Sequence, residues 1–402
     1  MKKVLIIAPY EGIFPPTNGG MQRCFHIIHQ ASKLYDVSLV FHGDSGTILK
    51  AAAIYPAISK LHIHSSRQGR TQANISSSRI GRLWTAIRYR WIVKNIKLPA
   101  DSSFLQLHPV LKRVLKKNKF DFIILEQLGL ISQAGWIKRN NPYAEIVYDA
   151  HNVDSTLLKQ KKAGELIFKM VLATESNLYR KIDCLFTCSE HDLQVMQQLN
   201  AGKIKRGYVL PNGVDTISMK YKQALDDKEI YNVLFCGSLD YEPNIEGISW
   251  FCNKIWPLVM EQEPRMKLYI VGKAPVPGLK DELEKASVVF IGQVDDVQTW
   301  YNKCNVAIAP LKSGSGTRLK ILEAMSMGNP VVSTTQGAEG INYTDETDIL
   351  VADTEYAFAQ KIISLAQNKN ESNRIRANAR KLAEEQYDWN VAGEKMKTFM
   401  GV

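Results

Sequence analysis

The feature that most constrains the fold is a regular alternation of short apolar runs with helical segments along the chain. Twelve runs rich in Val, Ile and Leu have the length and continuous hydrophobicity of strands that are buried on both faces of a parallel sheet. They lie at 4–8, 37–41, 122–126, 145–150, 184–189 and 208–211 in the first half, and at 232–239, 267–272, 288–292, 306–310, 331–335 and 349–352 in the second. This order predicts an α/β fold.

Helices are expected between most of these strands, at 21–34, 164–181, 245–262, 279–286, 295–304, 317–327 and 355–367. The stretch between Pro211 and Glu229 shows neither a helical nor a strand period, so we place a linker there. A chain of 402 residues is also too long for one comfortable core. We therefore expect two Rossmann-like, doubly wound domains at 1–212 and 213–387, followed by a terminal segment at 388–402, with a ligand cleft between the domains.

The N-terminal stretch, the lengths of the apolar runs and the cysteine spacing suggest a soluble cytoplasmic protein. The start MKKVLIIAPY is basic, but its apolar run ends at Pro9, which is too short for the core of a signal peptide. No stretch approaches the roughly 18 apolar residues of a membrane span. The cysteines form no CxxC pair and no zinc spacing, which favours reduced thiols; they are Cys24, Cys184, Cys188, Cys236, Cys252 and Cys304.

Positive charge is concentrated in the first half. Residues 1–200 hold 27 basic and 14 acidic residues, and between Arg67 and Lys119 the sequence has 13 basic residues against the single acid Asp101. The part at 78–97 would form an amphipathic helix whose Arg, Lys and Trp residues suit a headgroup interface. A solvated basic face over a buried stripe explains the pattern as well. No nucleic-acid module is visible, so we expect an anionic acceptor or membrane surface at 67–119, and no nucleic acid.

Two glycine-containing loops follow strands, where ligands of open α/β sheets bind. In the first half, PYEGIFPPTNGG follows strand 4–8 and places Gly19 and Gly20 at the start of a helix, where free N–H groups attract an anion. A plain glycine turn would explain the pair equally well. The loop has no GxGxxG pattern, which argues against a dinucleotide fingerprint.

The second loop, in SGSGTRLKILEAMSMGNPVV (313–332), is more informative. Gly314 and Gly316 let the backbone approach a ligand closely, and a helix begins near 317. Arg318 and Lys320 then put two cations at the helix N-terminus, where they are unfavourable unless an anion is present. A diphosphate would suit the loop and cations, and Glu323, about one turn on, would suit the hydroxyls of a ribose. Lys320 and Glu323 pairing on a solvated face is the alternative.

With these residues in place, the chain resembles family-4 retaining glycosyltransferases, in which two Rossmann-like domains face each other in the GT-B fold. The resemblance implies that Gly314 and Gly316 approach the donor diphosphate, that Arg318 and Lys320 neutralise it, and that Glu323 holds the ribose. It adds Gly19, Gly20, Gly237, Gly272, Ser315 and Thr317 to the donor site, Val294 as an apolar contact to the base, and 388–402 as a segment that crosses back to the first domain. It is carried by NGGMQR, YDAHNVDS, VLPNGVD, FCGSLDYEPN, IVGKAP, IGQVDDV, GSGTRLKILEAMSMGNPVVSTTQGAEG and YDW.

Two positions depart from the family pattern. Ser315 stands where many members have an acid that contacts the donor sugar, and Ser238 stands where many have an arginine. Both changes fit a subgroup with the GSGTRLKILEAM signature. They leave the sugar's identity open.

His151, after strand 145–150, is implied to hydrogen-bond the transferred sugar and not to act as a general base. A histidine satisfied locally by Asp149 or Asp154 is the alternative. Retaining enzymes of this family use same-face transfer in which the leaving phosphate assists, and no DxD-type metal motif stands in the right place. We therefore expect a metal-independent enzyme without a cofactor, with His151, Arg318 and Lys320 as its catalytic residues.

The resemblance implies sugar transfer from a nucleotide diphosphate sugar to a glycan or lipid-linked acceptor in cell-envelope polysaccharide synthesis. The protein would be cytoplasmic, or peripheral on the inner face of the plasma membrane. A nucleotide-sugar epimerase of the same architecture, or a non-catalytic protein that binds sugar nucleotides, remains an alternative.

Overall fold

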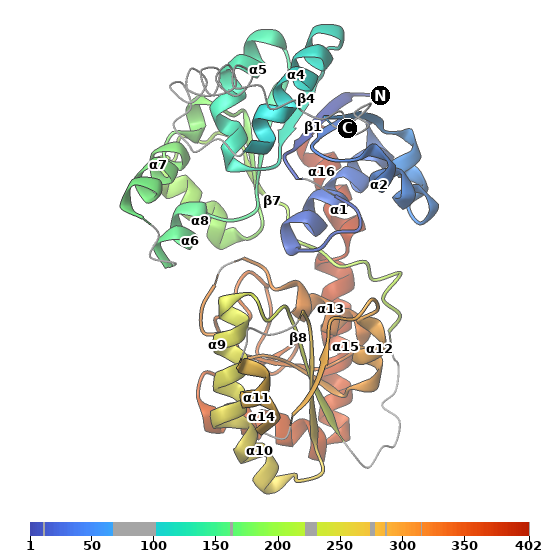
Figure 1. The fold of residues 1–402 in the computed structure, drawn as a ribbon, viewed down its shortest axis with the longest axis vertical. Helices are drawn as coiled ribbons and strands as arrows, with labels where there is room; N and C mark the ends of the chain where they lie inside the picture. The colour runs from blue at the N-terminus through green and yellow to red at the C-terminus, as the bar shows by residue number, and fades with distance from the viewer. Residues whose placement is uncertain are drawn as a thin grey trace, which may run out of the picture. The chain divides into compact units, whose positions relative to one another are not determined.

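The computed structural model describes residues 1–10, 13–66, 102–160, 164–221, 231–273, 278–285, 288–314 and 316–401. The chain forms two compact units, shown in Figure 1. One contains Met1–Leu210 together with Gly393–Val402, and the other contains Pro211–Ala392. The boundary predicted at 212/213 lies two residues from the one in the structure. The terminal segment predicted at 388–402 is divided, because residues 388–392 belong to the second unit.

The first unit is built on a seven-stranded parallel sheet with the order β3-β2-β1-β4-β5-β6-β7. The inner strand β1 is buried along five of its six residues, as expected for a sheet covered on both faces. The strands are β1 (Lys3–Ala8), β2 (Asp36–Phe41), β3 (His62–Ser65), β4 (Phe122–Leu125), β5 (Glu145–Ala150), β6 (Cys184–Thr187) and β7 (Gly207–Val209). The helices are α1 (Gly19–Leu34), α2 (Ser45–Lys50), α4 (Ser102–Lys117), α5 (Ala134–Asn140), α6 (Asp154–Gln160), α7 (Glu165–Glu175) and α8 (Glu190–Leu199).

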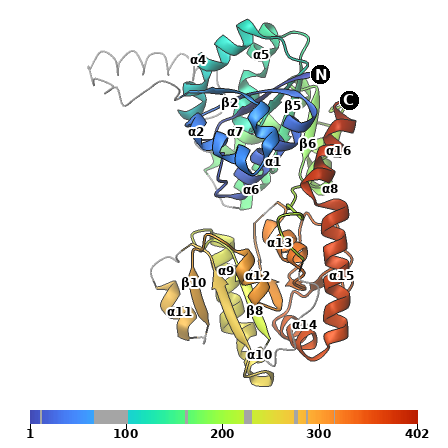
Figure 2. The same cartoon turned by 90° about the vertical axis from the view of Figure 1, so that its right-hand side faces the viewer.

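The second unit repeats the plan with a six-stranded parallel sheet in the order β10-β9-β8-β11-β12-β13. Figure 2 shows this sheet with its helices, α15 being the longest. The strands are β8 (Asn232–Cys236), β9 (Lys267–Val271), β10 (Val289–Gly292), β11 (Val306–Ala309), β12 (Val331–Ser333) and β13 (Leu350–Val351). The helices are α9 (Glu242–Trp250), α10 (Trp256–Gln262), α11 (Leu279–Lys285), α12 (Gln298–Lys303), α13 (Leu319–Met327), α14 (Glu355–Gln367), α15 (Lys369–Gln386) and α16 (Trp389–Phe399).

The last helix, α16, begins in the second unit and ends in the first. Its C-terminal part packs on the first unit, where the ring of Phe399 stacks on Tyr208 with 4.1 Å between centroids. Beyond the helix, Nζ of Lys2 donates a hydrogen bond to the carbonyl of Met400 at 3.0 Å. Residues 393–402 are therefore part of the hydrophobic and polar packing of the first unit.

All twelve predicted strands are present, which confirms the α/β prediction, but some elements differ from their predicted form. The helix expected at 245–262 is interrupted by a π-helical stretch at Phe251–Ile255, after which α10 begins with Pro257 in its first turn. Proline has no N–H to continue the preceding helical ladder. The expected helix 164–181 ends at Glu175, and a 3-10 turn follows. No helix within the described ranges is long and apolar enough to cross a membrane.

Candidate functional site

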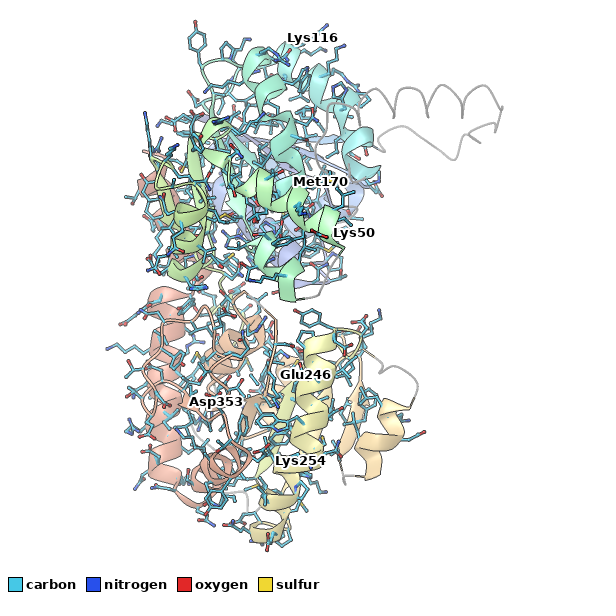
Figure 3. All side chains as sticks on the ribbon, turned by 90° about the vertical axis from the view of Figure 1, so that its left-hand side faces the viewer. Lys50, Lys116, Met170, Glu246, Lys254 and Asp353 are labelled. Atoms are coloured by element: carbon cyan, nitrogen blue, oxygen red, sulfur yellow. The ribbon has the colours of Figure 1, made fainter. Side chains whose placement is uncertain are left out.

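The glycine loop of the second unit lies between β11 and α13. Gly314 and Gly316 adopt positive φ values of 98° and 82°, which only glycine adopts without strain. A Cβ atom on Gly314 would lie 3.0 Å from an Arg318 guanidinium nitrogen and 3.1 Å from the Tyr241 hydroxyl. The loop is tied to α9 by Ser313, whose hydroxyl donates to Glu246 at 2.7 Å; Glu246 is labelled in Figure 3. Ser315 lies outside the described residues.

Helix α13 begins two residues later than predicted, so that Arg318 is its N-cap and Lys320 lies in its first turn. Arg318 is buried and Lys320 is half-buried. Arg318 is only 8% exposed, and burial lowers its pKa. Burial also lowers the pKa of Lys320 to about 8. Desolvation of this kind disfavours a charged side chain unless an opposite charge is added.

The direct contacts of the Lys320 ammonium are neutral groups, although the charges of Arg318 and Glu323 also act on it. Its Nζ donates a hydrogen bond to Oδ1 of Asn244 at 2.7 Å and lies 4.5 Å from the centroid of the Phe235 ring. In the described part of the chain, no carboxylate comes within ion-pair distance of Lys320. Glu323 instead accepts a hydrogen bond from the hydroxyl of Tyr301 at 3.2 Å, and its burial raises its pKa. The solvated Lys320–Glu323 pair considered as an alternative is therefore absent.

The two glycines that follow the first strands of this unit have different surroundings. A Cβ on Gly237 would lie 2.6 Å from Nζ of Lys320, whereas a Cβ on Gly272 would lie 1.9 Å from the backbone oxygen of Gly237. Gly237 thus makes room for the ammonium group, and Gly272 makes room for the neighbouring strand end. Val294 is half-buried and packs against the apolar cluster of the unit. The role predicted for Val294 has no further support in the structure.

A second loop, residues 334–340 after β12, holds the glycine loop in place. Nε2 of Gln336 donates hydrogen bonds to the carbonyl of Gly314 at 2.8 Å and to Glu339 at 2.6 Å. The hydroxyl of Thr317 donates to the carbonyl of Gly340 at 3.4 Å. Sequence reasoning assigned no role to Gln336, Asn244 or Tyr301, although Asn244 lies in the quoted FCGSLDYEPN motif. Their contacts join segments that are distant in sequence, so no local pattern marks them.

In the first unit, Gly19 and Gly20 begin α1. The side chain of Asn18 caps this helix by accepting a hydrogen bond from the N–H of Met21 at 2.9 Å. A Cβ on Gly20 would lie 2.8 Å from the Tyr10 hydroxyl and 3.4 Å from Nδ1 of His151. Gly20 is therefore required for a close approach and not merely for a turn. The structure brings it beside the predicted His151.

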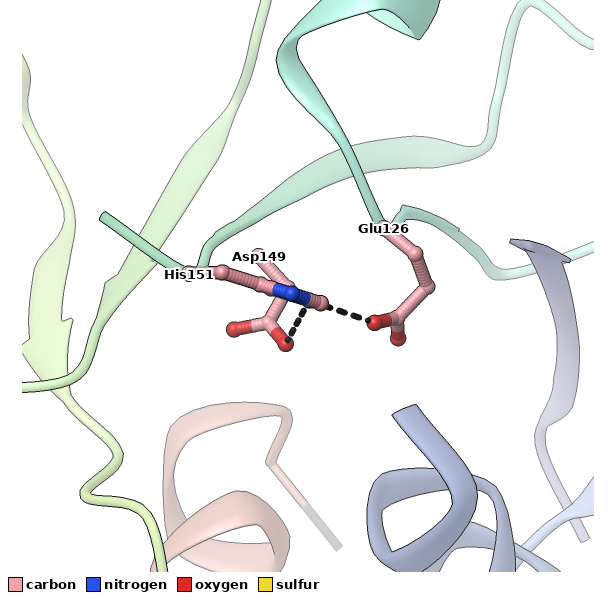
Figure 4. A group of neighbouring side chains, drawn as sticks. All are labelled: Glu126, Asp149 and His151. Atoms are coloured by element: carbon pink, nitrogen blue, oxygen red, sulfur yellow. Dashed lines mark hydrogen bonds and ion pairs between the residues drawn. The ribbon is translucent and has the colours of Figure 1, made fainter. Parts of the chain in front are cut away.

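His151 follows β5 and belongs to a buried polar cluster, drawn in Figure 4. Its Nε2 lies 3.0 Å from Oε2 of Glu126 and 3.6 Å from Oδ2 of Asp149. Its Nδ1 lies 3.1 Å from the hydroxyl of Tyr10. The alternative interpretation expected a local hydrogen bond from His151 to Asp149 or Asp154. In the structure the nearest carboxylate to Nε2 is that of Glu126, and Asp149 lies farther away. Glu126 ends the FIILE run, and a carboxyl at the end of a buried strand was the signal that sequence reasoning passed over.

Asp149 is paired with a different residue. Both of its oxygens accept hydrogen bonds from the guanidinium of Arg23, with 2.9 Å between Nε and Oδ2. The two side chains are no more than 1% exposed. Glu126, Asp149 and His151 offer ligand atoms within 4.8 Å of one another, a separation that a metal ion would accept. Because Arg23 already occupies both oxygens of Asp149, we interpret the cluster as a hydrogen-bonded ion-pair network.

The predicted basic surface lies largely outside the described residues, because 67–101 are among those not described. The rest of it includes α4, where Lys112, Arg113, Lys116 and Lys117 are exposed; Lys116 is labelled in Figure 3. Their neighbours Val114 and Leu115 are buried. This part of the segment is thus a solvated basic face over a buried stripe.

Comparison with known proteins gives three results. Residues 231–368 match a family model described as "Glycosyl transferases group 1". A Klebsiella pneumoniae protein described as an uncharacterized 44.6 kDa protein in the cps region is 27% identical over an alignment of 299 residues, and the alignment covers 69% of this chain and 74% of that protein.

Solved structures with a similar fold include Anabaena HepE in complex with UDP-glucose, with a TM-score of 0.66, 14% identity and 100% of both chains covered. Another is an S. aureus TarM variant in complex with fondaparinux, alpha-GlcNAc-glycerol and UDP, with a TM-score of 0.67, 13% identity and 100% of both chains covered. These similarities, with the two parallel sheets, confirm the predicted GT-B fold.

Proposed function

We propose that this protein is a retaining glycosyltransferase that moves a sugar from a nucleotide diphosphate sugar to a glycan or lipid-linked acceptor in cell-envelope polysaccharide synthesis. The observation that carries the proposal is Lys320, a half-buried cation in the first turn of α13 whose direct hydrogen-bond partner is the neutral side chain of Asn244. Desolvating a cation without an ion-pair partner is unfavourable, and a helix N-terminus favours anions. A bound diphosphate would offset both costs.

A diphosphate bound at Lys320 assigns roles to the other residues of the proposed donor site. The glycine loop at 314–316 would approach the diphosphate through its backbone, and Arg318 would share its charge. Glu323 would accept hydrogen bonds from the ribose hydroxyls. The match of residues 231–368 to glycosyl transferases group 1 supports this assignment, and the UDP-glucose bound to HepE makes a uridine nucleotide the first donor to test.

In the proposed reaction, the bond between the anomeric carbon and the diphosphate oxygen breaks while a bond to the acceptor oxygen forms on the same face of the sugar. The acceptor proton passes to the departing diphosphate. Arg318, Lys320 and the α13 dipole would stabilise the charge that develops on that diphosphate. Because these groups supply positive charge, we propose that the reaction requires no metal ion, and no cofactor beyond the co-substrate. His151 would hydrogen-bond the transferred sugar.

The acceptor is proposed from the charge of the first half of the chain and from the cps-region relative. The concentration of basic residues at 67–119 suits an anionic or lipid-linked acceptor, and with it a peripheral position at the inner face of the plasma membrane. The relative in a cps region supports a role in polysaccharide synthesis. A panel of nucleotide diphosphate sugars, incubated with membrane lipid extracts from a capsule-producing bacterium, would test both donor and acceptor.

The decisive readout is acceptor-dependent release of nucleoside diphosphate. A transferase releases it in step with glycosylated product, and Lys320→Met should abolish both. An epimerase, the alternative, would convert the donor sugar without releasing nucleoside diphosphate. A protein that binds the donor but neither converts nor transfers its sugar would contradict the proposed activity.

A further inference from the structure

The cluster around His151 determines more than the position of its ring. Nδ1 and Nε2 have different partners, because Nε2 faces Glu126 and Nδ1 faces the hydroxyl of Tyr10. Glu126 is completely buried, while the His151 side chain is 13% exposed. Nδ1 and the Tyr10 hydroxyl both lie close to Gly20, since a Cβ at that residue would come within 3.4 Å of Nδ1 and 2.8 Å of the hydroxyl. Nδ1 is therefore the ring nitrogen that faces the start of α1.

The charges in the cluster limit where protons reside. Arg23 and Asp149 compensate each other through two hydrogen bonds. This leaves Glu126, for which His151 is the basic side chain within hydrogen-bonding distance among the described residues. Burial, and then the charge of Asp149, raise the pKa of Glu126. A buried carboxylate without a compensating charge is costly, and one proton shared between Oε2 of Glu126 and Nε2 of His151, which lie 3.0 Å apart, would remove that cost.

That proton can occupy two positions. If it resides on the imidazole, both ring nitrogens carry hydrogen. If it resides on the carboxyl, Glu126 donates to Nε2, and the hydrogen of the neutral ring is on Nδ1. Nδ1 carries hydrogen in both arrangements.

We propose that Glu126 is a positioning residue that keeps a hydrogen on Nδ1 of His151, so that His151 faces its ligand as a hydrogen-bond donor. The ligand group that replaces Tyr10 at Nδ1 is then an acceptor oxygen, such as an oxygen of the donor sugar. This extension to the sugar rests on the proposed function, whereas the hydrogen on Nδ1 is a property of the first unit by itself.

Long-range ¹H–¹⁵N NMR on protein labelled at histidine nitrogens tests the proposal directly. The His151 signals are assigned by their loss in His151→Asn, and the measurement is made at pH 7.5 without ligand. We expect Nδ1 to show the shift of a nitrogen that carries hydrogen. A shift typical of a bare, lone-pair nitrogen at Nδ1 would overturn the proposal, because Tyr10 would then be the donor.

Glu126→Gln tests the role of the carboxyl. The amide keeps the shape but removes the charge that retains the proton, and its oxygen accepts from Nε2–H. The Nδ1 signal should therefore move toward the lone-pair value, and an unchanged signal would show that Glu126 does not control it. Glu175→Gln is the matched control, because Glu175 is also a buried carboxyl of this unit but accepts from the backbone N–H groups of Asp154 and Ser155. It should leave the His151 signals in place.

Activity gives an independent readout. If the protein transfers sugar, Glu126→Gln should lower kcat at least tenfold while the Kd for nucleoside diphosphate stays within twofold of the wild-type value. Equal losses in kcat and in nucleoside diphosphate affinity would indicate a general structural defect and contradict a positioning role. If no transfer is detected with any donor, the proposed function fails, while the NMR result still decides the protonation of His151.

Discussion

At the scale of single residues, Lys320 contributes most to the proposed donor site because its ammonium group has a neutral hydrogen-bond partner and no close ion pair among the described residues. Its neighbours Asn244 and Phe235 interact with an ammonium through a dipole and a ring face, which stabilise it less than a carboxylate would. The burial that lowers its pKa to about 8 places its titration close to neutral pH. Its charge is thus measurable through the pH dependence of binding.

Nucleoside diphosphate affinity should fall as the pH rises through about 8. Below that pH Lys320 is charged and attracts the diphosphate, and above it the neutral amine must take up a proton on binding. The diphosphate itself is already ionised from about pH 7 upward. Calorimetry at pH 7 and pH 9 should show about a tenfold loss. Lys320→Met should bind weakly and without this dependence; the same slope in this variant would assign the effect to another group.

The titration of Lys320 should also affect the free energy of unfolding, which should rise with pH while the affinity for nucleoside diphosphate falls. The folded-state pKa of Lys320 is below its ordinary value, so the unfolded chain binds more protons between about pH 8 and the ordinary lysine pKa of about 10.4. The contribution of Lys320 to the free energy of unfolding should therefore increase with pH across this range. Comparing denaturant curves of wild type and Lys320→Met isolates that contribution.

Glu323→Gln should reduce donor affinity without reducing stability. A hydrogen bond from a ribose hydroxyl to the carboxylate is worth about 1.5–3 kcal/mol, or roughly ten- to a hundredfold in Kd. Burial raises the pKa of Glu323, so its charge costs stability above that pKa, and the neutral amide should leave the melting temperature unchanged or higher. A lower melting temperature with unchanged nucleoside affinity would mean that Glu323 serves the fold through Tyr301.

At the scale of elements, the ends of β8 and β9 carry two glycines with separable roles. Gly237→Ala should displace the flexible Lys320 side chain and weaken diphosphate binding with little change in stability. Gly272→Ala should destabilise the second unit by about 1–3 kcal/mol, because its Cβ would meet the backbone of Gly237 and not a side chain. Thermal melts and diphosphate titrations of both variants would separate the effects. Equal destabilisation by the two substitutions would contradict this assignment.

The sequence predicted elements well where the apolar pattern was continuous. It did not predict β3, because HIHS is an edge strand with only one strongly apolar residue. It also did not predict α15, whose 18 residues are mostly polar or charged and which nevertheless buries Arg376. In the second unit the sequence pattern placed the glycine loop directly before a helix that carries Arg318, Lys320 and Glu323, and the structure has this arrangement. The contacts of Glu126, Tyr10, Asn244 and Gln336 depend on tertiary packing, which a local pattern cannot show.

At the scale of the whole molecule, the last ten residues complete the first unit although they follow the second in sequence. Met396 is fully buried there, and its carbonyl faces the hydroxyl of Tyr35 at 3.5 Å. Met396→Ala should therefore cost about 2–5 kcal/mol of stability. Hydrogen exchange followed by mass spectrometry should show the loss in peptides from 1–210. A loss confined to peptides from 211–392 would contradict the assignment of this segment.

Arg318 and Lys320 are proposed to bind the donor diphosphate, and one calorimetric comparison tests this role. UDP and uridine are each titrated into wild type, Arg318→Ala, Lys320→Met and Lys254→Met, the last being an exposed lysine of the same unit. Uridine lacks the diphosphate and so reports on the base and ribose contacts alone. We predict that Arg318→Ala and Lys320→Met each weaken UDP binding at least tenfold, leave uridine binding within twofold, and do not lower the melting temperature, while Lys254→Met changes nothing. Equal losses for UDP and uridine, or a large loss of unliganded stability, would show that these cations hold the fold and would contradict the donor site.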